Sequence, residues 1–413
     1  MEVEIITIGD EILTGHTIDS NSAYIAQLLT GVGMAVNFIS SCGDSVEQME
    51  EAFRLALKRA RVVVTTGGLG PTDDDNTKKA IVKVFKRNLI FHEEILDDIK
   101  ARYAKRGIEM PAINQNQALL PQGASAFPNR SGSAVGICIS ENGRTFISLP
   151  GVPHEMKQIM VDEVVPYLKG LPIGEAIKII KLRTTGIVES RVAELLMANM
   201  KPEPGVKLAY LPSVSGVDLR IMSYSATEDE ALEKARSLQR YVESEVGKYI
   251  YGREGDTLEG VVGQLLKDND KTLSVAESCT GGGIGALVTS VPGSSEYFLG
   301  GVVSYSNDSK IRDLSVDPKI IEENGAVSEE CAEAMAAGCR QRFGSDYALS
   351  ITGIAGPEGG TDEKPVGLVF IGLASAHATY ARKFMFGSNR ETNRLRAAYA
   401  TLELLRRDIL DIS

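Results

Sequence analysis

Two long stretches of this chain alternate short apolar strands with amphipathic helices. In the first stretch the pattern predicts strands at residues 3–8 and 62–66 and helices at residues 20–31 and 77–87, and a further helix opens at the capping box of residues 45–48. Alternation of this kind is typical of βαβ units, which build a mostly parallel sheet covered by helices on both faces.

The same alternation of strands and helices is predicted towards the C-terminus, with strands near residues 272–276, 301–305, 347–351 and 368–373. A chain of 413 residues is too long for one typical core, so several domains are expected. We predict two three-layer α/β domains, at residues 1–170 and 253–413. Residues 171–252 are predicted to form a small α+β module, for which a role as a spacer or dimerisation element is the simplest interpretation.

Composition excludes several classes of protein. The formal net charge of −11 argues against non-specific nucleic-acid binding, which needs a cationic surface. Five cysteines without a Cys-x-x-Cys pair indicate neither a disulfide framework nor a zinc site, and they suit a reducing compartment. No apolar run approaches the roughly 18 residues that span a bilayer. We therefore expect a cytoplasmic protein without a membrane partner or a direct nucleic-acid partner.

Residues 277–282 (Glu-Ser-Cys-Thr-Gly-Gly) join a predicted buried strand to a glycine-rich helix start. Unpaired N–H groups and the helix dipole favour an anion or oxyanion there, which suits a nucleophile. Ser278 is the preferred nucleophile, and Cys279 is its rival because a thiol is intrinsically more reactive. The alternative is a tight turn with a capping serine and small residues for packing.

A serine nucleophile needs a base, and a lysine can serve if burial lowers its pKa. Lys310 follows the predicted strand 301–305 and should lie beside Ser278 if the two strands are neighbours. The alternative for Lys310 is a solvated surface lysine. No histidine offers a triad: His16, His92 and His154 fall in the first domain, and His377 is placed at a strand edge.

The loop at residues 353–367 carries five glycines and two prolines. It is either a phosphate cradle or a long hairpin connection, and we favour the cradle, with ligand contacts at Gly353, Ala355 and Gly356. Arg390 lies at the start of the last predicted helix, where its guanidinium could bind two oxygens of a phosphate. The alternative interpretation of Arg390 is an ordinary surface arginine.

Two loops of the first domain are rich in glycine and acids, at residues 9–15 and 67–75. Both should lie at the carboxyl ends of parallel strands, where ligands of open α/β sheets bind. Glycines let a backbone approach a phosphate, and carboxylates suit a hard divalent cation. The second loop is neither a Walker loop nor Gly-x-Gly-x-x-Gly. Its acids have an alternative role in capping the helix from residue 77.

Residues 67–75 match the Gly-Gly-x-Gly-x-Thr-x-x-Asp signature of the molybdopterin-binding fold. Together with residues 9–15, Asp19, Asn21 and residues 150–156, they resemble the N-terminal domain of the CinA (competence/damage-inducible) family. The resemblance implies hydrolysis of the pyrophosphate of ADP-ribose with a divalent cation. It implies ligand contacts at Gly67, Gly68, Gly70 and Thr72, and metal or catalytic roles among Asp10, Glu11, Asp19, Asp73, Asp74 and Asp75.

Residues 277–282, 305–310, 350–357 and 364–367 look like the nicotinamide-nucleotide amidase domain of the same family. This resemblance implies hydrolysis of nicotinamide mononucleotide to nicotinate mononucleotide and ammonia, without a cofactor. The catalytic residues it implies are Ser278 as nucleophile, Lys310 as base and Tyr305 in an assisting role. Cys279, Thr280 and Gly281 would line the site, and a homodimer is expected by resemblance.

Two other functions remain open at this point. The first domain could bind a pterin or a nucleotide without turnover, using its acidic loop for binding alone. The whole chain could instead act through a protein partner in competence, although its acidic balance argues against direct contact with DNA.

Overall fold

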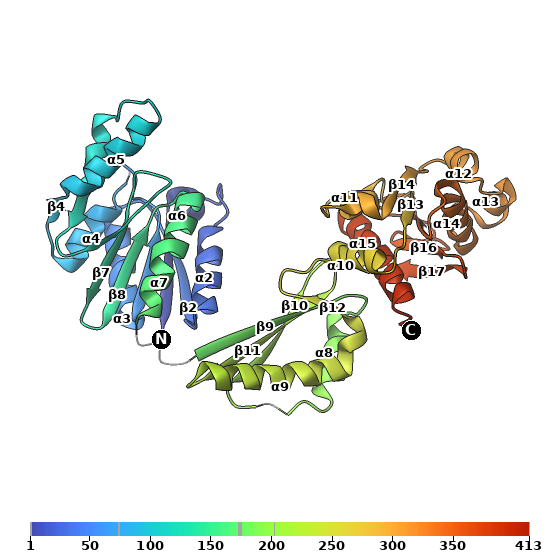
Figure 1. Ribbon diagram of the computed structural model, residues 1–413, viewed down its shortest axis with the longest axis horizontal. Helices are drawn as coiled ribbons and strands as arrows, with labels where there is room; N and C mark the ends of the chain where they lie inside the picture. The colour runs from blue at the N-terminus through green and yellow to red at the C-terminus, as the bar shows by residue number, and fades with distance from the viewer. Residues whose placement is uncertain (1, 73–74, 172–175, 202, 413) are drawn as a thin grey trace. The chain divides into compact units, whose positions relative to one another are not determined.

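The computed structural model describes residues 2–72, 75–171, 176–201 and 203–412 (Figure 1). The chain forms two compact units, one of Met1–Ile179 with Ser223–Lys234 and one of Ile180–Met222 with Ala235–Ser413. In the described part of the chain, no helix has the length and apolar character needed to cross a membrane.

A six-stranded sheet forms the centre of the first unit, in the order β2-β1-β3-β8-β7-β6. The first four strands are parallel, whereas β7 and β6 each run antiparallel to their neighbour. The sequence therefore predicted the parallel part correctly and missed the antiparallel edge. The strands are β1 (Val3–Ile8), β2 (Val36–Cys42), β3 (Val62–Thr66), β6 (Ser125–Phe127), β7 (Gly136–Glu141) and β8 (Arg144–Leu149).

Helices cover both faces of this sheet, because successive strand residues point to opposite sides. Ile5 and Val64 pack in one apolar cluster with residues of α2 and α6, while Ile6 and Val63 pack in a second cluster with residues of α3, α4 and α5. The helices are α1 (Asp10–Leu13), α2 (Asn21–Gly31), α3 (Val46–Arg59), α4 (Thr77–Phe85), α5 (Glu93–Lys105), α6 (Pro153–Ile159) and α7 (Val165–Lys169), with η1 (Ala112–Ala118) and η2 (Met160–Val164). A two-stranded ladder of β4 (Leu89–Phe91) and β5 (Leu119–Pro121) lies apart from the sheet.

The register of the parallel strands brings several loops to one edge. Thr66 pairs with Thr7 on one side and with Leu149 on the other, and Ile8 pairs with Cys42. The segments that begin at residues 9, 43, 67 and 150 therefore start at the same edge, called here the carboxyl edge. Ligands of open α/β sheets bind at such an edge.

The small module contains a four-stranded sheet in the order β10-β11-β9-β12, with two main helices. This agrees with the α+β texture predicted from sequence. Its elements are β9 (Ala176–Thr184), α8 (Glu189–Met197), β10 (Val206–Pro212), β11 (Val217–Ser225), α9 (Glu228–Val246), η3 (Gly247–Tyr249) and β12 (Ile250–Arg253).

A five-stranded sheet, β14-β13-β15-β16-β17, forms the centre of the C-terminal domain. The first three strands are parallel, but β16 runs antiparallel to β15 and β17 antiparallel to β16. The loop that joins β15 to β16 is therefore a hairpin connection in topology. The strands are β13 (Leu273–Glu277), β14 (Phe298–Val303), β15 (Tyr347–Gly353), β16 (Leu368–Ala374) and β17 (Thr379–Met385).

This sheet is also the middle of three layers. Val275 packs in one apolar cluster with Leu258 of α10 and Leu402 of α15, whereas the next residue, Ala276, packs with Met335 of α14 on the other face. The helices are α10 (Leu258–Asp268), α11 (Gly283–Thr289), α12 (Asn307–Leu314), α13 (Pro318–Asn324), α14 (Glu329–Phe343) and α15 (Arg390–Ile409), with η4 (Ser294–Glu296).

Candidate active sites

Ser278 lies in a tight turn directly after β13. Its N–H donates to the Ile351 carbonyl at 3.0 Å, and its own carbonyl accepts from the N–H of Gly281 at 3.1 Å. The Ser278 side chain is only 8% exposed. Bonds to a neighbouring strand and across the turn therefore fix the backbone that carries the serine.

Lys310, in the first turn of α12, reaches this serine. Its Nζ lies 3.1 Å from Ser278 Oγ, 2.8 Å from the Ser304 carbonyl and 3.4 Å from the Tyr305 carbonyl. The strands β13 and β14 are neighbours, as the prediction required, with Glu277 opposite Val303. At 1% exposure Lys310 is not the surface lysine that the alternative interpretation described.

Burial lowers the pKa of Lys310, because the charged ammonium loses its hydration in this site. A neutral amine has two N–H bonds and one lone pair. The Ser304 and Tyr305 carbonyls can accept both N–H bonds, which leaves the lone pair for the Ser278 hydroxyl. This arrangement suits a lysine that acts as a general base.

Cys279 is less suited to nucleophilic attack than its neighbour. Its side chain is 6% exposed, and burial raises the pKa of its thiol to about 11. A thiol of that pKa is almost entirely protonated near neutral pH, and the thiolate is the reactive form. All five cysteines of the chain are free and buried.

The expected anion site at the start of α11 is already filled by the protein. The carboxylate of Glu277 accepts from the N–H groups of Gly282, Ile284 and Gly285 at 2.9, 3.1 and 2.8 Å. It also accepts from Thr280 Oγ1 at 2.7 Å. Because a resident carboxylate occupies these N–H groups, the start of α11 is not the free anion site that the sequence suggested. The oxyanion donors predicted from the sequence, the backbone amides near Cys279–Gly281, lie earlier in the turn.

Donors for an oxyanion remain earlier in the turn. The N–H groups of Cys279 and Thr280 make no hydrogen bond to another residue in the described part of the chain. Arg394 of α15 donates from Nη2 to the Thr280 carbonyl at 2.6 Å and so fixes this peptide from behind. Two adjacent backbone donors next to a nucleophile are the usual components of an oxyanion hole.

The hydrogen bond between Lys310 and Tyr305 is made by the Tyr305 backbone carbonyl. Its ring is 60% exposed, and its hydroxyl accepts a bond from Arg390 Nη2 at 3.2 Å. We expected this tyrosine to orient the lysine or relay its proton. The structure instead assigns the lysine contact to the Tyr305 carbonyl and pairs the hydroxyl with an arginine.

Side chains of α15 hold the glycine-rich loop at residues 353–367 by hydrogen bonds to its backbone carbonyls. Arg390 Nη1 donates to the Gly356 carbonyl at 2.8 Å, and Asn393 Nδ2 donates to the Ala355 carbonyl at 3.0 Å. The packing of Gly353 against the backbone of β16 leaves no room for a side chain there, since a Cβ would lie 2.7 Å from the Leu368 carbonyl. The loop therefore docks onto α15, and its role as a phosphate cradle stays a prediction.

An open pocket of about 410 Å³ lies at the start of α15. Arg390 and Arg394 line it one helical turn apart, together with the N-cap residue Asn389. Two guanidinium groups at a helix N-terminus form a favourable environment for a phosphate.

In the first unit, close packing accounts for two of the three glycines in the loop at residues 67–75, Gly67 and Gly68. A Cβ on Gly67 would lie 2.2 Å from the Ile8 carbonyl, on Gly68 2.3 Å from Thr77 Oγ1, and on Gly70 2.3 Å from Asp75 Oδ2. From the sequence, these glycines were explained by the approach of a phosphate. The structure adds that a side chain at Gly67 would meet the backbone of β1 and one at Gly68 would meet Thr77 of α4, whereas one at Gly70 would meet the carboxylate of Asp75, which can move.

Asp75 accepts two hydrogen bonds inside its own loop. Its Oδ2 atom receives the N–H of Thr72 at 3.0 Å and the Thr72 hydroxyl at 2.6 Å. The predicted ligands Asp73 and Asp74 lie outside the described residues. Thr72 therefore orients the one carboxylate of this run that the structure describes.

Asp44 is a site residue that was not predicted from the sequence. Its Oδ2 atom accepts from the N–H of Asp10 at 3.0 Å, and its own N–H donates to Asp10 Oδ1 at 3.2 Å. The signal was present in the sequence, because Gly43 and Asp44 follow β2 at the carboxyl edge just as Gly9 and Asp10 follow β1.

Asp19 and Glu11 border a separate small pocket of about 120 Å³ with Asn21 and Thr66. Asp19 Oδ1 accepts from the N–H of Ser22 at 2.9 Å and so caps α2, while Asn21 Nδ2 donates to Thr66 Oγ1 and to the Gly151 carbonyl. The three predicted motifs of this domain thus meet at one edge.

The described acids do not by themselves form a metal centre. Among residues that the structure describes, no three His, Cys, Asp or Glu side chains are placed to hold one ion. Four of the six predicted ligands are described: Asp10, Glu11, Asp19 and Asp75. The divalent cation remains a prediction from resemblance, and we derive no step through it.

Three family models match the chain in order. They are "Probable molybdopterin binding domain" at residues 4–170, "Damage-inducible protein CinA KH domain" at residues 181–252 and "CinA C-terminal domain" at residues 255–409. A CinA-like protein of Gemmatimonas aurantiaca is 42% identical over 411 residues, covering 98% of this chain and 96% of the relative. This chain belongs to the CinA family.

A second CinA-like protein, from Nostoc punctiforme, is 41% identical over 416 residues, covering 99% of this chain and 100% of the relative. Among solved structures, a CinA protein of Thermoplasma acidophilum is 34% identical, with a TM-score of 0.36, covering 39% of this chain and 94% of that one. The KH assignment of residues 181–252 had no counterpart in the prediction from sequence, which identified only a small α+β module.

Proposed function

We propose that residues 253–413 hydrolyse the carboxamide of nicotinamide mononucleotide, giving nicotinate mononucleotide and ammonia. The observation that carries this proposal is the 3.1 Å approach of Lys310 Nζ to Ser278 Oγ, with a lysine that is 1% exposed. A buried amine beside a serine hydroxyl is the pairing that a Ser–Lys amidase requires.

In the first half of the reaction Ser278 Oγ attacks the carboxamide carbon while neutral Lys310 takes the hydroxyl proton. The negative charge that develops on the amide oxygen is stabilised by the N–H groups of Cys279 and Thr280. Lys310 then returns a proton to the nitrogen as the C–N bond breaks, so that ammonia leaves and an ester to Ser278 remains.

In the second half of the reaction water hydrolyses the ester, with Lys310 again acting first as base and then as acid. Lys310 removes a proton from water as its oxygen attacks the ester carbon, and it gives that proton back to Ser278 Oγ as the ester breaks. The products are the carboxylic acid, which releases its proton to the solvent, and the original hydroxyl, so one water is consumed for each ammonia released. Apart from the substrate and this water, the proposed steps use side chains and backbone groups of the chain.

Arg390 and Arg394 supply the binding end of the proposed site. Their guanidinium groups line the pocket at the start of α15, and Arg390 also reaches the Tyr305 hydroxyl. A mononucleotide phosphate in this pocket would receive charge-assisted hydrogen bonds. The exposed Tyr305 ring offers a surface against which a pyridine ring can stack.

The decisive test is ammonia release from nicotinamide mononucleotide by the wild type, Ser278→Ala and Cys279→Ala. We expect Ser278→Ala to lose at least about a thousandfold in kcat and Cys279→Ala to keep most of the activity. Ammonia release by Ser278→Ala at the wild-type rate would exclude this nucleophile. Absence of ammonia from the wild type would exclude the amidase itself.

For the N-terminal domain we propose hydrolysis of the pyrophosphate of ADP-ribose to AMP and ribose 5-phosphate, which would place both domains in pyridine-nucleotide salvage. The supporting observation is the meeting of the Asp10, Asp44 and Asp75 loops at one carboxyl edge. AMP release from ADP-ribose, measured with and without added divalent cation, tests this activity. Binding without release would favour a pterin- or nucleotide-binding module.

A role in competence through a protein partner is the remaining alternative, because members of the family are named for competence and damage induction. Both catalytic proposals would fail together if the wild type neither released ammonia nor cleaved ADP-ribose. Retention of DNA at physiological salt would instead indicate direct contact with DNA and would contradict the expectation from the net charge of −11.

A further inference from the structure

Residues 129–133 form a loop at the carboxyl edge, although the strand that follows the loop, β7, runs antiparallel to its neighbour β8. β7 runs antiparallel to β8, with Ile137 opposite Ser148, so β7 begins where β8 ends. The next residue after β8, Pro150, accepts a bond from the Thr66 hydroxyl at 2.8 Å. The loop that leads into β7 therefore joins the acidic loops as a further wall of this edge.

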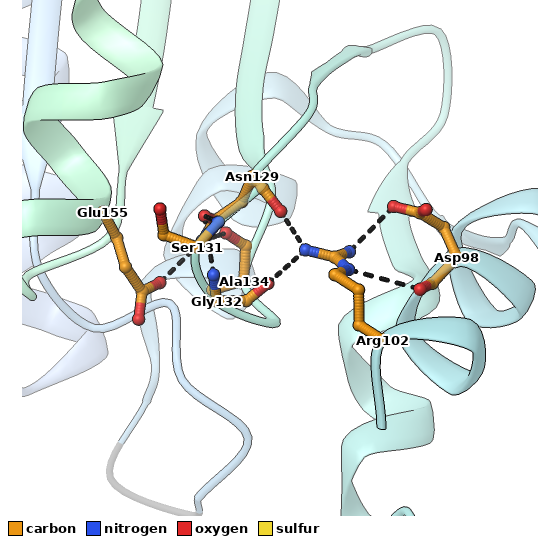
Figure 2. A network of polar contacts seen from close by, with 7 residues as sticks. All are labelled: Asp98, Arg102, Asn129, Ser131, Gly132, Ala134 and Glu155. Atoms are coloured by element: carbon orange, nitrogen blue, oxygen red, sulfur yellow. Dashed lines mark hydrogen bonds and ion pairs between the residues drawn. The ribbon is translucent and has the colours of Figure 1, made fainter. Parts of the chain in front are cut away.

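A single buried asparagine organises the loop, as Figure 2 shows. Asn129 is 1% exposed, and its Oδ1 atom accepts from the N–H groups of Ser131 and Gly132 at 3.0 and 2.9 Å. Its Nδ2 atom donates to the Ala134 carbonyl at 2.8 Å and to Glu155 Oε2 at 2.6 Å. Because every donor and acceptor of the amide is used, the loop has one strongly preferred shape.

Two further contacts close the loop from opposite sides (Figure 2). Arg102 of α5, which pairs with Asp98 at 2.8 Å, donates to the carbonyls of Asn129 and Gly132. On the other side, a Cβ on Gly132 would lie 2.1 Å from the carboxyl group of Glu155. The loop is thus held between α5 and the first turn of α6.

The carboxyl edge needs a cation if it is to hold a phosphorylated ligand. The two lysines after the acidic loop are engaged, Lys78 with Asn116 and Gln117 and Lys79 with Asn76. Arg130 is exposed in the organised loop and makes no hydrogen bond or ion pair with any residue that the structure describes. The described acids at this edge include Asp10, Glu11, Asp19, Asp44 and Asp75, and Glu155 contacts the loop itself.

We propose that Arg130 pairs with the phosphate oxygens of the ligand at the carboxyl edge, and that Asn129 and Glu155 are positioning residues that hold it there. The inference rests on the proposed ADP-ribose function of this domain. A planar guanidinium matches two phosphate oxygens, and a pre-organised loop loses little conformational freedom when the ligand binds.

Calorimetric titration of the full chain with the α,β-methylene analogue of ADP-ribose, in the presence of Mg²⁺, tests Arg130 directly. We expect Arg130→Gln to bind about tenfold or more weakly, the usual loss for one charge-assisted contact. Arg144→Gln is the matched control, since Arg144 is an exposed arginine at the start of β8, at the opposite edge of the same sheet. It should bind as the wild type does.

Trypsin provides a second readout, because it cleaves after Arg130. The analogue should slow this cleavage in the wild type, and Asn129→Ala should accelerate it and weaken binding while ammonia release from nicotinamide mononucleotide stays unchanged. Equal binding by the wild type and Arg130→Gln would overturn the role of Arg130 but not the ADP-ribose function. Absence of binding by the wild type would overturn both. Unchanged binding by Asn129→Ala would overturn the positioning role of Asn129.

Discussion

Arg394 Nη2 donates a 2.6 Å hydrogen bond to the carbonyl oxygen of Thr280, which links the first turns of α15 to the turn that carries Ser278. The Thr280 hydroxyl at the same time donates to Glu277 at 2.7 Å. Thr280 is therefore fixed through both its backbone and its side chain. The backbone donors proposed for the oxyanion depend on a helix that begins more than a hundred residues later along the chain.

Substitution of Arg394 by lysine should lower kcat for ammonia release by about ten- to a hundredfold, because small displacements of catalytic groups have effects of that size. The lysine keeps a positive charge beside the pocket but loses the fork that holds the Thr280 carbonyl. Steady-state kinetics measure the effect, with Arg382→Lys on the exposed strand β17 as the control. A rise in KM at unchanged kcat would contradict a positioning role.

Lys310→Met should abolish amidase activity without unfolding the protein. Methionine fills a similar volume and removes an amine whose charged form is costly to bury, so we expect an unchanged or slightly higher melting temperature. Loss of the base should lower kcat by about a hundred- to ten-thousandfold. Arginine at this position should be equally inactive, since it cannot lose its proton. Appreciable activity in either variant would exclude Lys310 as the base.

The pH dependence follows from the lowered pKa of Lys310. Because only the neutral amine is a base, kcat/KM should rise with pH through that pKa, with the midpoint of the rise below 10.5, the ordinary value for lysine. Between the two values the unfolded chain binds more protons than the folded one, so the free energy of unfolding also rises with pH.

Rate profiles of the wild type and Cys279→Ala test this assignment. Both profiles should rise with pH in the same way, because burial raises the pKa of the Cys279 thiol to about 11 and lowers the pKa of Lys310, so the lysine loses its proton first. A shift of the profile in Cys279→Ala would show that the thiol controls the rate.

Glu277→Gln should destabilise the C-terminal domain and lower its activity. The carboxylate receives four donors around the nucleophile turn, and an amide can accept fewer and weaker bonds. We expect a loss of about 1–3 kcal/mol in the free energy of unfolding, measured by urea denaturation. Glu259→Gln, in the first turn of α10, is the control for an acidic residue at another helix start. Equal stabilities of the two variants would contradict the role given to Glu277.

Local patterns in the sequence predicted much of the fold. The strands Val3–Ile8 and Val62–Thr66 have the predicted bounds, and the helix that begins at Val46 has Ser45 as its N-cap, with Ser45 Oγ accepting from the N–H of Gln48. The antiparallel strands were missed because strand direction is not encoded in local periodicity. β16, for example, is apolar at every position and would suit either direction.

The same limit applies to the sites. The sequence identified Ser278 and Lys310 as candidates, and it even supplied the two strands that bring them together. It gave Tyr305 a role in assisting Lys310, and in the structure the Tyr305 carbonyl lies 3.4 Å from Lys310 Nζ while the Tyr305 hydroxyl accepts from Arg390. It described the N–H groups at the start of α11 as unpaired, whereas Glu277 accepts from them. Both details depend on side-chain direction, which local sequence patterns do not encode.

By itself, the sequence determined many of the strands and helices, the family and the identity of the groups capable of chemistry. These follow from periodicity, capping residues and short motifs, all of which act between residues close in the chain. Only the tertiary structure decided that Lys310 is buried, that Arg394 holds Thr280 and that Asn129 locks its loop to Glu155. The physical reason is that burial and long-range hydrogen bonds depend on which segments pack together, and that packing sets the pKa, the geometry and the freedom of each group.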